Sequence, residues 1–223
     1  MLDVFFEDRE DAGAQLAAKI AVEEPAKPVV LALPRGGVPV AYEICKRFRA
    51  PLDVLLVRKI GAPANPEVAL GAIVDGAQPQ IVLNDDIMAA CGVTPRYIDV
   101  EARRQLAEID RRRRMYVGNR MPLPLAGRNV ILVDDGIATG ATVKVALKAL
   151  RRLGCGSVLL AIPVAPLEVI SELRADVDRI VCLHMPADFR AVGLHYRDFH
   201  QTSDEEVIEI LALARGSADE TPA

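Results

Sequence analysis

Short runs of apolar residues alternate with amphipathic segments along most of this chain. Runs rich in Val, Ile and Leu that have the length of buried strands occupy residues 28–33, 52–57, 130–133, 157–162 and 177–183. Apolar residues at helical spacing predict helices over residues 9–24, 38–48, 141–153, 166–173 and 204–213. This alternation is typical of an α/β fold, and we expect an open, mostly parallel sheet with helices on both faces.

The alternation breaks over residues 60–118, which we interpret as an insertion. Within it we expect a loop with two prolines, a hairpin or flap of two short strands, and a long helix, over residues 60–66, 69–74 with 80–83, and 95–116. Thr94 is placed to cap the long helix, because Pro95 follows it at the first helical position. Residues 184–203 have no strong period, and the small polar residues 215–223 are expected to form a disordered tail.

The segment Val130–Thr142 carries the clearest chemical signal in the chain. Its apolar strand runs into an acid pair, Asp134 and Asp135, and then into a loop of small residues before the next helix. The loop residues that can bind a phosphate are Gly136, Ala138, Thr139, Gly140, Ala141 and Thr142. Such a loop directs backbone N–H groups, hydroxyls and the positive end of a helix dipole at one anion. The upstream carboxylates can accept hydrogen bonds from sugar hydroxyls, so the segment predicts a ribose phosphate site.

This segment resembles the 5-phosphoribosyl-1-pyrophosphate (PRPP) signature of the type I phosphoribosyltransferases. In that family two acids close a strand, and the following loop ends in Thr-Gly-x-Ser/Thr. The match runs through Asp134, Asp135, Thr139, Gly140 and Thr142. The resemblance extends in order over about residues 28–183 and implies transfer of the phosphoribosyl group from PRPP to a small acceptor, with release of pyrophosphate. It further implies Mg²⁺ held mainly by PRPP rather than by protein ligands, and a place in nucleoside metabolism.

Basic and glycine residues follow two other predicted strands. Arg35-Gly36-Gly37 comes after the first strand, and Arg58-Lys59 comes after the run that ends at residue 57. Ligands bind outside the carboxyl ends of strands in open parallel sheets, and an arginine beside two glycines suits an anion. In the family, the turn after the first strand holds pyrophosphate, and a basic residue after the second strand reaches the pyrophosphate as it leaves. The resemblance therefore implies pyrophosphate binding by Arg35, Gly36, Gly37, Arg58 and Lys59, catalytic roles for Asp134, Asp135 and Lys59, and closure of the 60–66 loop over the site.

The sequence leaves the acceptor of the phosphoribosyl group open. In the family it lies under a variable hood, for which residues 184–203 are the candidate, and Phe189 or Tyr196 could stack on its ring or fill a small satellite core. The 6-oxopurine enzymes carry a lysine just past the strand that follows the phosphate-loop helix. Here Ile162 to Pro166 contain no lysine, which argues against hypoxanthine and guanine. Adenine, pyrimidines and simple amines remain open.

The composition limits the other classes of function. Hydrophobic residues make up 51% of the 223 residues, which is ample for the core of a single domain over residues 1–223. The 27 basic and 31 acidic residues are nearly balanced, which argues against a general nucleic-acid binder. The four cysteines are widely spaced and are expected to be reduced thiols. No apolar run reaches the roughly 18 residues of a membrane span, so we expect a cytoplasmic protein, with a homodimer left open.

A PRPP-sensing regulator on the same fold is the alternative interpretation. Its support is the arginine-rich part of the long helix, where Arg103-Arg104 and Arg111 to Arg114 could contact nucleic acid. Acids lie one helical turn from these arginines, as in the pair of Glu108 and Arg112, which is typical of a solvated, ion-paired surface. No aromatic residues interleave with the arginines to stack on bases. The enzyme is therefore the favoured interpretation.

Overall fold

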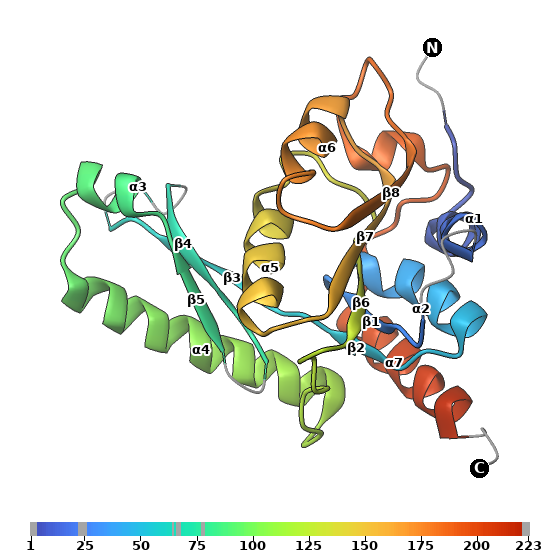
Figure 1. The fold of residues 1–223 in the computed structure, drawn as a ribbon, viewed down its shortest axis with the longest axis horizontal. Helices are drawn as coiled ribbons and strands as arrows, with labels where there is room; N and C mark the ends of the chain where they lie inside the picture. The colour runs from blue at the N-terminus through green and yellow to red at the C-terminus, as the bar shows by residue number, and fades with distance from the viewer. Residues whose placement is uncertain (1–3, 22–25, 64, 66–67, 77–78, 220–223) are drawn as a thin grey trace.

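Five parallel strands form the central sheet, in the order β2-β1-β6-β7-β8 (Figure 1). The structure is a computed structural model that describes residues 4–21, 26–63, 65, 68–76 and 79–219. The strands are β1 (Val29–Ala32), β2 (Leu52–Val54), β6 (Asn129–Val133), β7 (Ser157–Val164) and β8 (Arg179–His184). The predicted open parallel sheet is confirmed.

Helices cover both faces of this sheet because its strands are apolar on both sides. Val30 and Ile131 lie in one hydrophobic cluster, and their chain neighbours Leu31 and Leu132 lie in another. The first cluster includes residues of α1 (Arg9–Ala21), α2 (Gly37–Phe48) and α7 (Asp204–Asp219). The second includes residues of α5 (Ala141–Arg152) and α6 (Leu167–Leu173). None of the described helices is long and apolar enough to span a membrane.

The predicted insertion forms a second, antiparallel sheet that stands beside α5 (Figure 1). Its strands are β3 (Val57–Gly61), β4 (Ala69–Val74) and β5 (Gln80–Leu83). Two helices complete it, the short α3 (Asp85–Ala90) and the long α4 (Pro95–Val117), which runs along the side of the sheet away from α5. Thr94 caps α4 as predicted, since its hydroxyl accepts a hydrogen bond from the Tyr97 N–H at 3.4 Å.

The single strand predicted over residues 52–57 is wrong. β2 ends at Val54, and the chain passes through the buried Leu55 and Leu56 into β3. Arg58 and Lys59 therefore lie inside an antiparallel strand, paired with β4, and not at the carboxyl end of a parallel strand. A continuous apolar run does not show where the chain leaves one sheet for another.

Several other boundaries also differ from the prediction. Helix α3 was not predicted, because its six residues, none of them buried, are too few to show an apolar period. Helix α7 continues to Asp219, so the disordered tail predicted from residue 215 is wrong as far as residue 219. Residues 220–223 lie outside the described residues, as do residues 22–24 of the first predicted helix.

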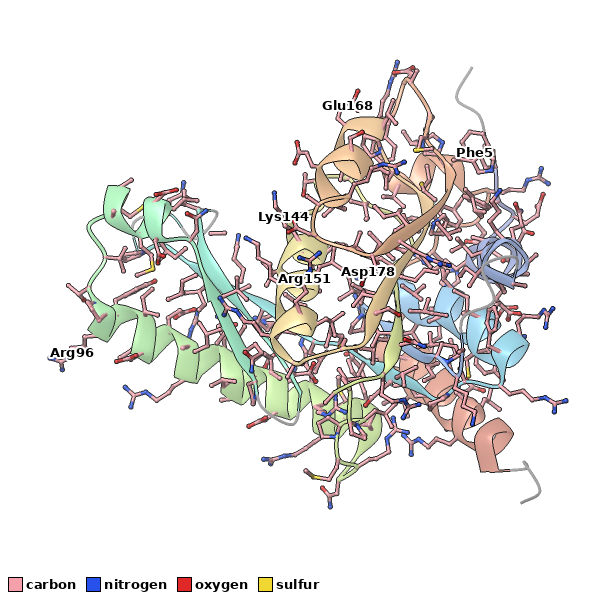
Figure 2. The ribbon with its side chains drawn as sticks, viewed as in Figure 1. Phe5, Arg96, Lys144, Arg151, Glu168 and Asp178 are labelled. Atoms are coloured by element: carbon pink, nitrogen blue, oxygen red, sulfur yellow. The ribbon has the colours of Figure 1, made fainter. Side chains whose placement is uncertain are left out.

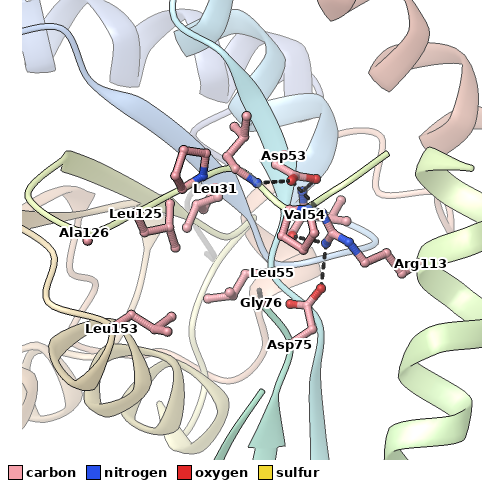
Figure 3. Close-up of a pocket in the computed structure, with 13 residues that line it drawn as sticks. Leu31, Asp53, Val54, Leu55, Asp75, Gly76, Arg113, Leu125, Ala126 and Leu153 are labelled. Atoms are coloured by element: carbon pink, nitrogen blue, oxygen red, sulfur yellow. Dashed lines mark hydrogen bonds and ion pairs between the residues drawn. The ribbon is translucent and has the colours of Figure 1, made fainter. Parts of the chain in front are cut away.

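A buried ion cluster fastens the insertion to the central sheet. Figure 3 shows Arg113 reaching from α4 to Asp53 on β2 and to Asp75 at the end of β4, beside a cavity of about 320 Å³. The guanidinium donates to Asp53 Oδ2 at 2.7 Å and to Asp75 Oδ2 at 2.6 Å, and both acids are 2% exposed. Asp75 also accepts the Leu56 N–H at 2.7 Å. Burial raises the pKa of Asp75 to about 6 even though Arg113 opposes the shift.

The regulatory interpretation of the arginine-rich pattern would place Arg113 on an exposed basic surface. Arg113 instead points into the ion cluster. The expected pair of Glu108 and Arg112 is confirmed at 2.8 Å, and Glu101 accepts a hydrogen bond from Gln105 at 2.6 Å. Glu101 also holds Arg104, and Glu108 holds Arg111. Three of these arginines are thus paired with two acids on the same helix.

We expect Arg113→Met to destabilise the protein by about 3–5 kcal/mol, because it leaves two carboxylates buried without their shared cation. Arg114→Met, one residue along α4 at an exposed position, is the matched control and should change the free energy of unfolding by less than about 0.5 kcal/mol. Urea denaturation of both variants measures the difference. Equal stability of the two variants would show that the cluster does not fasten the insertion.

Candidate active site

Two loops leave the carboxyl ends of β1 and β6 side by side. Ala32 pairs with Val133 in the parallel register, and the Leu33 N–H donates to the Val133 carbonyl at 2.9 Å. The glycine turn, residues 34–37, therefore starts next to the acid pair Asp134 and Asp135. The peptide bond between Pro34 and Arg35 is cis.

The glycine turn packs directly against the acid pair. A Cβ atom on Gly36 would collide with the carboxylate of Asp135, and one on Gly37 would lie 2.8 Å from the Val133 carbonyl oxygen. Only hydrogen atoms fit in these two places. The structure thus brings together the Arg35–Gly37 and Asp134–Asp135 segments that the sequence assigned to one site.

The phosphate loop, residues 136–142, ends at the first turn of α5, the helix on which Figure 2 labels Lys144 and Arg151. Gly140 caps the helix at a φ of 73°, a backbone conformation that favours glycine, and its carbonyl accepts the Lys144 N–H at 2.8 Å. The Ile137 N–H is held by the Val164 carbonyl at the end of β7, at 3.0 Å. This anchors the loop between the helix and the sheet.

The exposed part of the phosphate loop presents unused hydrogen-bond donors. Ala138, Thr139, Ala141 and Thr142 are exposed. Within the described ranges, the hydroxyls of Thr139 and Thr142 and the N–H groups of Ala138 and Thr139 have no protein acceptor. The first N–H groups of α5 are also without an intrahelical partner, as at any helix start. This arrangement can bind an anion such as a phosphate.

The two acids are electrostatically coupled. The Asp135 N–H donates to Asp134 Oδ1 at 2.9 Å. Burial and the negative charge of Asp135 hold the pKa of Asp134 well above its usual range. Both causes disfavour the ionised form of Asp134, since its charge would lie beside the negative charge of Asp135.

Arg9, the first residue of α1, holds that charge. Its Nε donates to Asp135 Oδ2 at 2.8 Å and its Nη1 donates to the His200 carbonyl at 2.7 Å. The guanidinium lies 3.9 Å from the centre of the Phe199 ring, and Arg9 is only 7% exposed. Arg9 was not among the predicted site residues. A charged residue at the start of an amphipathic helix is typical of a solvent-exposed position, and the partner of Arg9 is 126 residues away in the sequence.

The hood, residues 184–203, closes over the acid pair from the other side. It contains a short 3₁₀ helix, η1 (Val192–His195), and it is joined to the N-terminal segment by the Phe6–Tyr196 bridge. A Cβ atom on Gly136 would collide with Val192, so the phosphate loop lies directly against the hood.

Tyr196 belongs to the satellite core that was the alternative to stacking on an acceptor. Tyr196 is 4% exposed, and its hydroxyl donates to the Asp135 carbonyl at 2.5 Å. The Tyr196 hydroxyl therefore supports the backbone of the acid pair, and the buried ring has no free face for a substrate. Phe189 is half-buried beside His195, with ring centres 5.5 Å apart, and packs with the satellite core that was the alternative to stacking.

Arg58 and Lys59 are not placed beside the acid pair as predicted. The Arg58 guanidinium donates to Gln105 Oε1 on α4 at 2.9 Å. Both residues border a cleft of about 350 Å³ between β3 and α4. Residues 64, 66 and 67 of the expected closing loop lie outside the described residues, and the Gly61 carbonyl before them accepts the Tyr97 hydroxyl at 2.9 Å.

Arg35 is loosely held in this structure. Its Nη1 lies 3.9 Å from Asp204 Oδ1, and a third of its side chain is exposed. The same carboxylate accepts the Tyr116 hydroxyl at 2.6 Å, and burial together with Asp204 raises the pKa of Tyr116 to about 12. Because the contact with Asp204 is long, the Arg35 guanidinium can turn toward an anion above the glycine turn.

Comparisons with known proteins agree with this geometry. The sequence model of the phosphoribosyl transferase domain matches residues 6–198. Two proteins from strains of Mycobacterium tuberculosis, provisionally named phosphoribosyl transferases, are each 47% identical over 209 residues. The match covers 94% of this chain but 47% of each relative, so the chain spans about half their length.

A solved structure shows the same fold over almost the whole chain. The protein TT1426 from Thermus thermophilus is 43% identical, with a TM-score of 0.82. The alignment covers 93% of this chain and 97% of TT1426. The family match over most of the sequence and these relatives lead to one conclusion: the chain belongs to the phosphoribosyltransferase family.

Proposed function

We propose that this protein transfers the 5-phosphoribosyl group of PRPP to a base or amine, with release of pyrophosphate. The observation that carries the proposal is the packing of the glycine turn against Asp135, directly beside the phosphate loop at the start of α5. One compact surface thus offers donors for two phosphate groups and carboxylates for the sugar between them.

The phosphate loop is proposed to bind the 5′-phosphate. The free N–H groups and the two threonine hydroxyls of residues 138–142 would donate to its oxygens, and the α5 dipole would stabilise its charge. Binding energy from this non-reacting group fixes the ribose for the reaction at the anomeric carbon.

The glycine turn is proposed to bind the pyrophosphate. The backbone N–H groups at Gly36 and Gly37 can approach an anion closely, and Arg35 adds a forked cation. Arg58 and Lys59 face a different cleft in this structure, so their expected contacts with pyrophosphate require the insertion to close toward the glycine turn.

The acid pair is proposed to bind the ribose hydroxyls and stabilise the reacting sugar. Departure of pyrophosphate develops positive charge on the ribose ring, and carboxylates that are already in place stabilise that charge without rearrangement. Asp134 would give up its proton as the site fills, because two ionised carboxylates suit a cationic transition state better than one.

The residues present fit Mg²⁺ carried by the substrate. Within the described part of the chain no group of three or more potential ligands could hold a metal, while Mg²⁺ is usually bound by one or two carboxylates together with substrate phosphates. Asp134 and Asp135 are the carboxylates in reach. When bound with PRPP, the ion would neutralise charge on the leaving pyrophosphate.

The acceptor is proposed to enter between the hood and the glycine turn. The end of β7 carries no lysine, so we propose that hypoxanthine and guanine are poor acceptors, with adenine, pyrimidines and amines as the candidates. The regulatory alternative is less favoured, because the Arg113 side chain is only 12% exposed and three other arginines of α4, Arg104, Arg111 and Arg112, pair with acids on the same helix.

We expect PRPP with Mg²⁺ at about millimolar concentration to raise the melting temperature, because ligand that binds only the native state stabilises it. Ribose 5-phosphate and pyrophosphate should each do so more weakly, since each fills half of the site. A coupled pyrophosphate assay across purines, pyrimidines, nicotinate and simple amines then identifies the acceptor. A melting curve that PRPP leaves unmoved would refute the proposal, and rapid turnover with guanine would refute the argument from the missing lysine.

We expect Asp134→Asn to lower turnover about a hundredfold to a thousandfold while leaving stability nearly unchanged. The amide resembles the protonated carboxyl group that burial favours in the free protein, but it cannot ionise when PRPP binds. Thermal melting and initial rates separate the two effects. A variant that melts far below the parent protein would instead assign Asp134 a structural role.

We expect Gly36→Ala to weaken PRPP binding strongly, because the added methyl group must displace the Asp135 carboxylate. Gly216→Ala in α7 is the matched control, since a Cβ atom there meets nothing within 4 Å. The control should bind PRPP normally and gain up to about 1 kcal/mol of stability from the better helix propensity of alanine. Normal PRPP binding by Gly36→Ala would refute the assigned packing.

A further inference from the structure

One ion pair of the acid pair, between Arg9 and Asp135, joins residues that are far apart in the sequence. Arg9 comes from α1, outside the strand ends that form the rest of the site, and contacts Asp135 through a single nitrogen, Nε. The side chains of Arg9 and Asp135 are 8% and 16% exposed, so water screens their attraction only weakly. Such a contact is stronger than an ion pair on the surface.

The guanidinium of Arg9 is held on three sides. Its face lies on the Phe199 ring at 3.9 Å, and its Nη1 donates to the His200 carbonyl. His200 is itself fixed, because its N–H donates to Asp198 Oδ1 at 3.0 Å and its ring contacts Glu206 at 3.0 Å. Arg9 therefore loses little further freedom when it orients Asp135.

The N-terminal segment is fastened to the hood by the backbone as well. The Arg197 N–H donates to the Phe6 carbonyl and the Asp198 N–H to the Glu7 carbonyl, both at 2.8 Å. These bonds end two residues before Arg9. The start of α1 is thereby positioned so that the Arg9 side chain reaches between the hood and the acid pair.

The charge of Arg9 acts on the whole acid pair. Burial and Asp135 raise the pKa of Asp134, and Arg9 opposes that rise. Tyr196 from the hood also contacts the pair, because its hydroxyl donates to the Asp135 carbonyl. Arg9 contributes the positive charge in direct contact with the pair.

We infer that Arg9 is a positioning residue of the PRPP site, which holds the Asp135 carboxylate in the orientation in which it meets the ribose. The inference rests on the proposed function. Arg9 acts through Asp135 and through no substrate atom. It also makes the N-terminal helix and the end of the hood part of the catalytic assembly, although neither contributes a strand end.

The test measures PRPP–Mg²⁺ binding by titration calorimetry between about pH 6 and pH 9 for the parent chain and three variants. Arg9→Gln removes the positive charge, and Arg9→Lys keeps the charge without the planar guanidinium group. Arg197→Gln is the matched control, because it breaks another ion pair between the same two segments, with Glu7 at 3.1 Å, and does not touch Asp135. Circular dichroism and melting curves establish that each variant is folded.

We expect Arg9→Gln to weaken binding at least about tenfold near neutral pH and to move the acidic limb of the binding profile up by about one pH unit or more, because a cation next to an acid favours its ionised form. Arg9→Lys should recover part of the affinity, and Arg197→Gln should bind like the parent chain. A residue with a purely structural role would shift neither limb of this profile.

A double-mutant cycle then asks whether Arg9 acts through Asp135. In an Asp135→Asn background, Arg9→Gln should weaken PRPP binding little further. Should Arg9→Gln fail to fold, Phe199→Leu provides a second route: it leaves Arg9 in place without its supporting ring, and we expect a smaller loss of affinity with the same pH dependence.

Two results separate this inference from the proposed function. If the parent chain does not bind PRPP, the proposed function is wrong and the inference falls with it. If the parent chain binds PRPP and Arg9→Gln binds it equally well, or weakens it by the same factor at every pH and in the Asp135→Asn background, the inference alone is overturned.

Discussion

The site depends on the absence of a side chain at Gly36. The Asp135 carboxylate occupies the place where a Cβ atom of Gly36 would lie, so the glycine turn and the acid pair approach each other closely. The register of β1 with β6 brings these two loops out of the sheet at the same level. Asp135 is then held at its carbonyl by Tyr196 and at its carboxylate by Arg9. The position of this one residue is therefore determined by four separate segments of the chain.

The parts of the structure that depend on local patterns could be predicted from the sequence. The parallel strands are apolar runs of uniform character, and the phosphate loop combines two acids, glycines and hydroxyls within one strand–loop–helix junction. The meeting of the Arg35 and Asp134 segments also follows from sequence, because neighbouring parallel strands end at the same edge of a sheet. Both predictions needed only the order of elements.

The parts that depend on distant contacts could not be predicted in this way. Arg9 is polar at a helix start, and nothing near it in the sequence indicates that it is buried against a residue 126 positions away. Tyr196 lies in a segment without periodicity, where an aromatic ring fits a core as well as a ligand site. Arg58 was misplaced because Leu55 and Leu56 are buried in the connection between two sheets, so the apolar run continues past the end of β2. Helix α3 did carry a signal, the Asn84 cap before two acids, although its six residues are too few to show an apolar period.

The ion cluster at the base of the insertion has a consequence for how such proteins can diversify. Arg113 belongs to the inserted unit, whereas the buried Asp53 belongs to the central sheet, and loss of Arg113 would leave Asp53 with the longer contact to Arg120, at 3.3 Å, as its ion pair. A chimera that exchanges the β3–α4 unit between relatives must therefore carry a cation matched to the recipient's β2. Within that requirement, the residues of the unit outside the cluster can change while the sheet that carries the phosphate loop stays the same.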